Sequence, residues 1–181
     1  MGIDGAVIHN LAHLALCKAE NFEVFGGMGL NVYNSFTAEK LESLGVNLLT
    51  VSPEMQIKNG ANLGTLAKTA IFAYGRMPLM TTRNCPVKAQ IGCKNCGGKG
   101  SLTDRTGKTF PVTCDGEFSR LLNCVPVYMG DKKEDLKNFD YLYLSFTTET
   151  ADEVLEILGN YKNGTPDTKE FTRGLYYRNV E

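Results

Sequence analysis

Short apolar runs alternate with helical patterns along most of the chain, and this alternation constrains the fold more than any other feature. Apolar runs of strand length cover the segments 6–9, 23–32, 47–51, 71–79 and 140–146. Apolar residues at helical spacing cover the segments 11–19, 37–44, 63–69 and 151–161. Strands separated by single helices pair in parallel through right-handed crossovers. The expected fold class is therefore α/β, built either as a doubly wound sheet or as a β/α barrel.

The last of these helices has the clearest ends. Thr150 and Glu153 stand at the spacing of a capping box, in which each side chain accepts a hydrogen bond from the other residue's backbone N–H. Gly164 follows the apolar face as a stop signal. The segment 151–161 is therefore predicted as a helix that begins directly after Thr150.

The length of the chain favours part of a barrel. Eight β/α units need about 250 residues, whereas this chain has 181 residues. The first predicted strand begins close to the N-terminus, as though other β/α units preceded it. We expect a partial TIM-like β/α barrel, made of its C-terminal strands and helices and completed by a partner chain or by a missing N-terminal half. The predicted segments are β/α units (1–82), a cysteine-rich metal-binding β-hairpin insertion (83–130), and a final β/α unit with a C-terminal tail (131–181).

The composition is that of a globular domain. The chain is 43% hydrophobic and 22% charged with a formal net charge of -1, which excludes a disordered chain and a polycation. No apolar run has the length of a membrane span, and the first residues lack the pattern of a signal peptide. We therefore expect a cytoplasmic protein with no membrane contact. The cytoplasm keeps thiols reduced, so cysteines there are free to bind metal.

Five of the six cysteines fall within the segment 85–124. Cys93 and Cys96 form a C-x2-C knuckle, which lets two thiolates converge on one metal. Cys114 follows at the spacing of a second knuckle, but Glu117 occupies the last position of that knuckle. The fourth thiolate most simply comes from Cys85.

A predicted hairpin brings Cys114 to the knuckle. The turn Thr106-Gly107 separates two strand-like segments, and pairing about it would place Cys114 opposite about Lys99. Cys124 is the reserve ligand. Zinc and a 4Fe-4S cluster both accept four thiolates, and the spacing does not separate them or exclude unligated thiols. The predicted ligands are Cys85, Cys93, Cys96 and Cys114.

Six short segments follow one another along the chain in a specific order: NVYNS (31–35), SPE (52–54), YGRMPLM (74–80), TRNCP (82–86), LTDR (102–105) and TRGLYYR (172–178). As an ordered set over essentially the whole chain, they resemble the C-terminal part of the catalytic domain of the collagenase-like peptidase family, peptidase family U-thirty-two. Six residues separate Cys85 from Gly92 where the family has four. This difference is typical of a divergent branch.

The resemblance implies a TIM-barrel-like catalytic domain with a cysteine insertion. The family was named for collagen degradation, and other members are iron-sulfur proteins that hydroxylate RNA bases or a ubiquinone precursor, with prephenate as the oxygen donor in the RNA cases. Their four cluster ligands correspond to Cys85, Cys93, Cys96 and Cys114. The resemblance therefore favours a 4Fe-4S cluster and oxygen insertion into RNA or a small aromatic. The alternatives are a peptidase, or a non-catalytic module, with a structural zinc ion on the same cysteines.

Polar residues at the predicted carboxyl ends of strands are further candidates, because the chemistry of TIM barrels sits there; these are His9, Asn10, Asn34, Glu54 and Arg76. Glu54 could act as an acid or base, or cap a helix. Arg76 could hold the carboxylate of a prephenate-like molecule, or form a surface ion pair. His9 and His13 lack the glutamate of an H-E-x-x-H motif and are expected to be structural.

Two further features of the sequence bear on its function. A peptidase needs an activated nucleophile or a metal-bound water, and the sequence has neither G-x-S-x-G nor H-E-x-x-H. The segment 83–120 holds seven basic and three acidic residues. Its positive charge would suit RNA phosphates, or would offset four thiolates.

Overall fold

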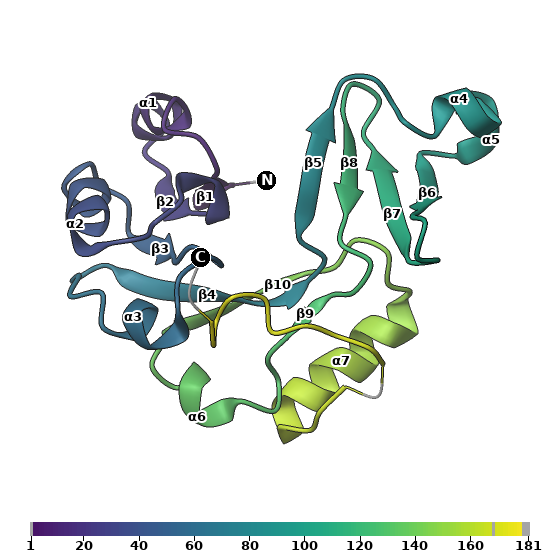
Figure 1. Cartoon of the computed structure of the whole chain (residues 1–181). Coiled ribbons are helices and arrows are strands. Elements are labelled where there is room, and N and C mark those ends of the chain that lie inside the picture. Colours follow the sequence, from purple (N-terminus) through teal and green to yellow (C-terminus); the bar gives the residue numbers. More distant parts are fainter. Residues whose placement is uncertain (1, 168, 179–181) are drawn as a thin grey trace. The chain divides into compact units, whose positions relative to one another are not determined.

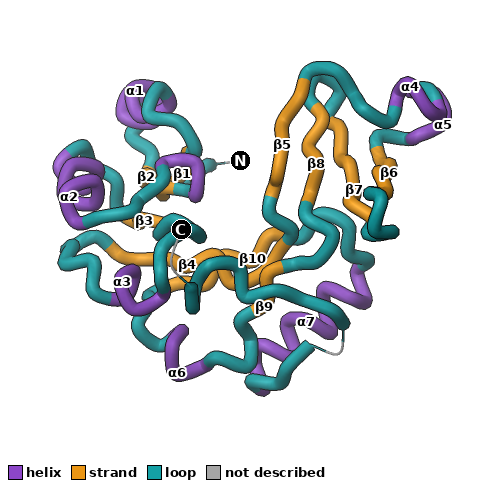
Figure 2. The backbone as a smooth tube through the Cα atoms, in the orientation of Figure 1, coloured by secondary structure: helices purple, strands orange, loops and turns teal. Residues whose placement is uncertain are grey.

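A computed structural model describes residues 2–167 and 169–178 and divides the chain into two compact units (Figure 1). The first unit comprises Met1–Ala73, Met129–Leu144 and Arg173–Glu181, and the second comprises Tyr74–Tyr128 and Ser145–Thr172. Each unit combines strands and helices (Figure 2), as the predicted α/β class requires. In the described part of the chain, no helix is long and apolar enough to cross a membrane.

Five strands of a six-stranded sheet lie side by side in the order in which the chain makes them: β1 (Gly5–Ile8), β2 (Glu23–Gly26), β3 (Leu48–Thr50), β4 (Lys68–Gly75) and β10 (Tyr141–Ser145). The pairs β1–β2, β2–β3 and β3–β4 are parallel. Lys68 of β4 contacts Tyr141 of β10, and Phe72 of β4 contacts Tyr143 of β10. Residue numbers therefore increase in the same direction along these two strands. A doubly wound sheet reverses its strand order at a switch point, and this sheet does not.

Short helices connect these strands: α1 (His13–Ala19), the 3-10 helix η1 (Met28–Leu30), α2 (Ser35–Ser43), α3 (Ile57–Ala61) and α6 (Lys133–Leu136). The predicted helices at 11–19 and 37–44 are confirmed within two residues at each end. The side chain of Asn34 caps α2, because its Oδ1 accepts a hydrogen bond from the Thr37 N–H at 2.8 Å. The predicted strand 23–32 is interrupted after Gly26 by η1.

The core of the first unit centres on β4, which is buried on both faces from Ala70 onward. Ile71 and Phe72 have no exposed surface. The Phe72 ring lies 5.6 Å from the Tyr143 ring in an edge-to-face arrangement, and the Tyr176 hydroxyl donates to the Phe72 carbonyl at 2.6 Å. A continuous apolar run is typical of a strand covered on both faces.

The predicted helix at 63–69 is wrong. Lys68 and Thr69 belong to β4, where they pair with Leu48 and Leu49 of β3. The helical spacing depended on Leu66, which is 95% exposed and packs against nothing. Strand pairing therefore outweighed a local apolar pattern, and the helix before β4 is α3.

The second unit contains an antiparallel sheet in the order β5 (Pro78–Thr82), β8 (Ser119–Leu122), β7 (Thr109–Cys114) and β6 (Lys99–Thr103). Its helices are α4 (Lys88–Ile91), α5 (Cys93–Cys96) and α7 (Ala151–Asn163). The short strand β9 (Val127–Tyr128) pairs antiparallel with the end of β4. The predicted boundary of the cysteine insertion follows residue 82, whereas β5, which ends at Thr82, pairs with β8 and lies in the second unit.

The helix α7 begins with the predicted capping box. The Glu153 N–H donates to the Thr150 hydroxyl at 3.3 Å, and the Thr150 N–H donates to the Glu153 carboxylate at 2.7 Å. Gly164 ends the helix in the left-handed conformation, as its position predicted.

Candidate metal centre

The β6–β7 hairpin sets the position of Cys114. Its turn is held by Asp104, whose Oδ1 accepts from the backbone N–H groups of Thr106 at 2.8 Å and Lys108 at 2.9 Å. Lys99 pairs with Thr113, one residue from the predicted register. The Cys114 N–H donates to the Gly98 carbonyl at 3.0 Å. Cys114 therefore lies beside the knuckle, as the hairpin argument predicted.

One face of this sheet carries residues of the candidate centre. Cys114 and Ser119 are opposite each other in the β7–β8 register, so their side chains lie on the same face. Val87, which is 2% exposed, packs on β6, where a Cβ at Gly100 would lie only 2.7 Å from its Cγ1. Glycine at this position therefore lets Val87 hold the segment that follows Cys85 against the sheet.

A cavity of about 490 Å³ lies at this end of the sheet. Three thiols from separate segments line it, those of Cys85, Cys93 and Cys114. The other described lining residues are Arg83, Asn84, Lys88, Gly116, Glu117 and Ser119. Two further cysteines of the insertion turn elsewhere. The Cys96 Sγ contacts the Cys93 carbonyl at 3.5 Å, and the Cys124 Sγ contacts the Asn123 Oδ1 at 3.6 Å.

Hydrogen-bond donors surround two of the cavity thiols. The Ser119 hydroxyl, followed by the Val87 N–H, lowers the pKa of the Cys85 thiol against the opposing effect of burial. The Gly116 N–H donates to the Cys114 Sγ at 3.4 Å. These donors stabilise thiolates, and the thiolate is the form of cysteine that binds metal.

Ser119 itself is unusual among the residues of the sheet. It is 1% exposed, and within the described residues its Oγ makes no hydrogen bond of regular geometry, although it lies near enough to the Cys85 thiol to lower the pKa of that thiol. A buried hydroxyl without a partner costs about 1–3 kcal/mol. A thiolate at Cys85 would accept the hydrogen bond that a neutral thiol leaves unmade.

The three thiols line one cavity but do not meet at one point. Across residues 2–167 and 169–178, no three Cys, His, Asp or Glu side chains lie close enough together to hold a metal as they stand. The helix α5 that carries Cys93 is a single turn between Gly92 at φ +73° and Gly97 at φ +56°. Glycine is favoured at both ends because these positive φ angles are strained for other residues.

The histidines behave as expected of structural residues. Nδ1 of His9 accepts a hydrogen bond from the Gly29 N–H at 3.2 Å. A Cβ at Gly27 would lie 2.3 Å from the His9 ring, so the ring packs directly on this glycine-containing segment. His13 begins α1, and the pair forms no cluster with other metal-ligating side chains of the described residues.

The remaining candidates of the first unit lie after strands, as predicted. The Asn10 Oδ1 accepts from the Ala12 N–H at 2.9 Å, and Asn34 caps α2. Glu54 is exposed after β3, and its N–H donates to the Ser52 Oγ at 3.4 Å. The first residue of α3 is Ile57, so Glu54 does not hold the N-cap position of that helix.

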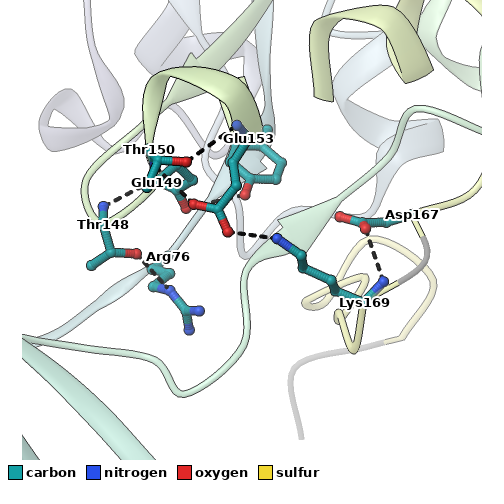
Figure 3. A network of polar contacts seen from close by, with 8 residues as sticks. Arg76, Thr148, Glu149, Thr150, Glu153, Asp167 and Lys169 are labelled. Carbon is teal, nitrogen blue, oxygen red and sulfur yellow. Dashed lines mark hydrogen bonds and ion pairs between the residues drawn. The ribbon is translucent and has the colours of Figure 1, made fainter. Parts of the chain in front are cut away.

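Arg76 lies in the second unit and joins three loop positions (Figure 3). Its Nη1 donates to the carbonyls of Asn123 at 3.0 Å and of Cys124, and its Nε donates to the Thr148 Oγ1 at 3.3 Å. The same residue lines a polar cavity of about 270 Å³. Arg76 therefore has a structural role, and its predicted contact with a carboxylate stays a prediction.

Carboxylates around the start of α7 complete this polar network (Figure 3). Glu149 accepts from the Tyr74 hydroxyl at 3.0 Å, and burial, followed by this carboxylate, raises the pKa of Tyr74. The Lys169 ammonium, 2.6 Å from Glu153, and the Thr150 N–H lower the pKa of Glu153 to about 2. These contacts hold the N-terminus of α7 in place.

Sequence reasoning missed Ser119. It carries no motif, and the strand β8 that presents it was not predicted. A usable signal was present in the segment 115–118, because Asp115 and Gly116 are typical turn residues after a strand. A hairpin about this turn places residue 119 opposite Cys114, as the structure has it.

Comparisons of the chain with protein-family models, curated proteins and solved structures found no match.

Proposed function

We propose that the chain binds a metal centre in the cysteine-lined cavity, with a 4Fe-4S cluster as the leading occupant and zinc as the alternative. One observation carries the proposal: Cys85, Cys93 and Cys114, from three separate segments, line the same cavity. The donors at the sulfurs and the unpartnered Ser119 hydroxyl fit thiolate ligands. Cys96 is the fourth ligand in the sequence prediction and lies one turn from Cys93.

The proposed activity is oxygen insertion into RNA or a small aromatic, with a prephenate-like acid as the oxygen donor. It follows from the resemblance to the collagenase-like peptidase family, and a bound cluster would supply one-electron redox chemistry. The cations Arg83 and Lys88 at the cavity support an anionic partner, and they also offset thiolate charge. Glu54 remains the proposed acid or base, and Arg76 the proposed substrate contact.

We also propose that the sheet of the first unit is part of a TIM-like barrel. Its support is the consecutive, parallel order of β1 to β4, which a barrel requires and a doubly wound sheet breaks. Further strands, from a partner chain or from another part of the same protein, would complete such a barrel. Free thiols fit a reducing compartment, so the cytoplasm is the proposed location.

The second candidate is a structural zinc site in a peptidase or in a non-catalytic module. The position of the cavity thiols favours it, since they join the 83–98 segment to the β7–β8 hairpin. A closed zinc site with four thiolates stabilises a fold and leaves no position for water. In that case any hydrolysis would occur elsewhere.

Purification without oxygen tests the proposal. The protein purified in this way should be brown and should contain about four iron and four sulfide per chain, as a 4Fe-4S cluster requires. One zinc per chain without sulfide under the same conditions would establish the zinc alternative. A chain that binds neither metal, even after reconstitution with iron and sulfide or with zinc, would refute the metal centre.

Substitution of Ser119 should separate stability from metal binding. Ser119→Ala removes a buried hydroxyl without a partner, so the metal-free chain should keep its stability or gain about 1 kcal/mol. Metal affinity should fall about 10- to 100-fold, since the Cys85 thiolate loses a donor. Urea unfolding and competition with a chelator measure the two effects.

Ser101→Ala is the matched control, because Ser101 is exposed on β6 of the same sheet. It should change neither quantity. Unchanged metal affinity in Ser119→Ala would show that Ser119 does not act on the centre.

A further inference from the structure

We infer that the carboxylate of Glu117, and not the thiol of Cys96, is the fourth donor of the metal centre. This inference rests on the proposed metal site and concerns the identity of one ligand. Glu117 lines the cavity together with Cys85, Cys93 and Cys114. Cys96 is not among the described residues that line the cavity, and its thiol donates to the Cys93 carbonyl at 3.5 Å.

The position of Glu117 is fixed by the turn between β7 and β8. The Asp115 Oδ1 accepts from the N–H groups of Glu117 at 3.2 Å and Phe118 at 2.8 Å. The Asp115 N–H donates to the Phe118 carbonyl at 3.2 Å, which closes the turn. Arg120 pairs with the Asp115 carboxylate at 3.3 Å. This turn therefore presents Glu117 at the rim of the cavity, next to the segment whose Gly116 N–H reaches the Cys114 sulfur.

The Glu117 side chain is available for this role. No hydrogen bond or ion pair occupies its carboxylate within the described residues, whereas Asp115 and Asp104 are both used to hold turns. In sequence, Glu117 follows Cys114 at the spacing of a C-x2-C knuckle. It thus occupies the position at which a paired knuckle would place its last ligand.

A carboxylate ligand would change the chemistry of the centre. Oxygen is a harder donor than sulfur and binds the soft, thiolate-rich metals less firmly. Three thiolates and a carboxylate would therefore hold the metal while leaving one position that an incoming anion could displace. Such a centre resembles a catalytic site more than a closed structural site.

Cobalt(II) binding to the full chain tests this assignment, because the intensity of thiolate-to-cobalt charge-transfer absorption rises with the number of thiolate ligands. With three thiolates, Cys96→Ser should keep the full intensity, whereas Cys114→Ser should lose the absorption together with the metal. Glu117→Gln should keep the intensity but weaken cobalt binding about tenfold or more. Glu39→Gln is the matched control, because Glu39 is exposed on α2 in the other unit. This variant should bind cobalt as the unchanged chain does.

Glu117→Cys gives a readout that misfolding cannot imitate. It adds a fourth thiolate, so the charge-transfer intensity should rise by about a third. A loss of about a quarter in Cys96→Ser, with no gain in Glu117→Cys, would overturn the inference and leave the metal centre intact. Absence of any thiolate-to-cobalt absorption in the unchanged chain would overturn both the inference and the proposed metal site.

Discussion

Cys114→Ser is expected to abolish stoichiometric metal binding. Cys114 lies opposite Ser119 on the sheet and lines the cavity with the thiols of Cys85 and Cys93. A serine hydroxyl stays protonated at neutral pH and replaces a thiolate poorly as a ligand of zinc or iron. The anaerobically purified variant should retain less than about a tenth of the iron and sulfide, or of the zinc, that the unchanged chain binds. Elemental analysis and visible absorption measure this loss.

The control is Cys124→Ser, which removes one thiol from the same insertion. Cys124 contacts Asn123 and lies outside the described lining of the cavity, so its variant should keep full metal content. Metal loss in Cys124→Ser, with retention in Cys114→Ser, would move the ligand to the reserve position. The thermal stability of the loaded chain provides a second readout, because a metal that binds only the folded state stabilises it.

Phe72→Ala should destabilise the first unit by about 3–5 kcal/mol. Phe72 has no exposed surface, packs edge-to-face on Tyr143, and lies on β4, which has β3 and β10 as neighbours in the sheet. Alanine leaves a cavity that the flanking strands cannot close, since both are held by their pairing to β4. Urea unfolding followed by circular dichroism measures the loss, and exchange of the Ile71 and Ala73 amides assigns it to this strand.

Phe36→Ala makes the same chemical change at a site where no packing is lost. Phe36 is 82% exposed on α2, so its variant should stay within about 0.5 kcal/mol of the unchanged chain. Equal effects of the two substitutions would show that β4 is not the core of this unit.

The sequence predicted best where local rules and pairing agree. The capping box of α7 depends on residues three apart, and the β6–β7 register follows from one turn, so both could be derived without tertiary information. The segment 63–69 shows the opposite case. Its helical spacing was real, but Lys68 and Thr69 gain backbone partners on β3, and this pairing extends β4 at the expense of the helix.

The candidate site was predictable in part for a similar reason. Cysteine spacing and the hairpin located Cys114 beside the knuckle, because covalent reach and strand register restrict it. The direction in which the Cys96 side chain points, the docking of Val87 on Gly100 and the burial of Ser119 depend on how α4 and α5 pack on the sheet. No spacing rule encodes that packing, so these features had to be observed.

The pairing of β9 with the end of β4 has an evolutionary consequence. Tyr74 lies opposite Tyr128 and Gly75 opposite Val127, so the chain leaves and re-enters the sheet at neighbouring positions, with paired Cα atoms about 5 Å apart. The residues between these two paired positions include the four-stranded sheet and the cysteine cavity. They form a cassette, an inserted segment whose two ends meet in one antiparallel stem. A short hairpin could close the stem in place of this segment, so related chains could differ in its length without a change in the order of β1 to β4.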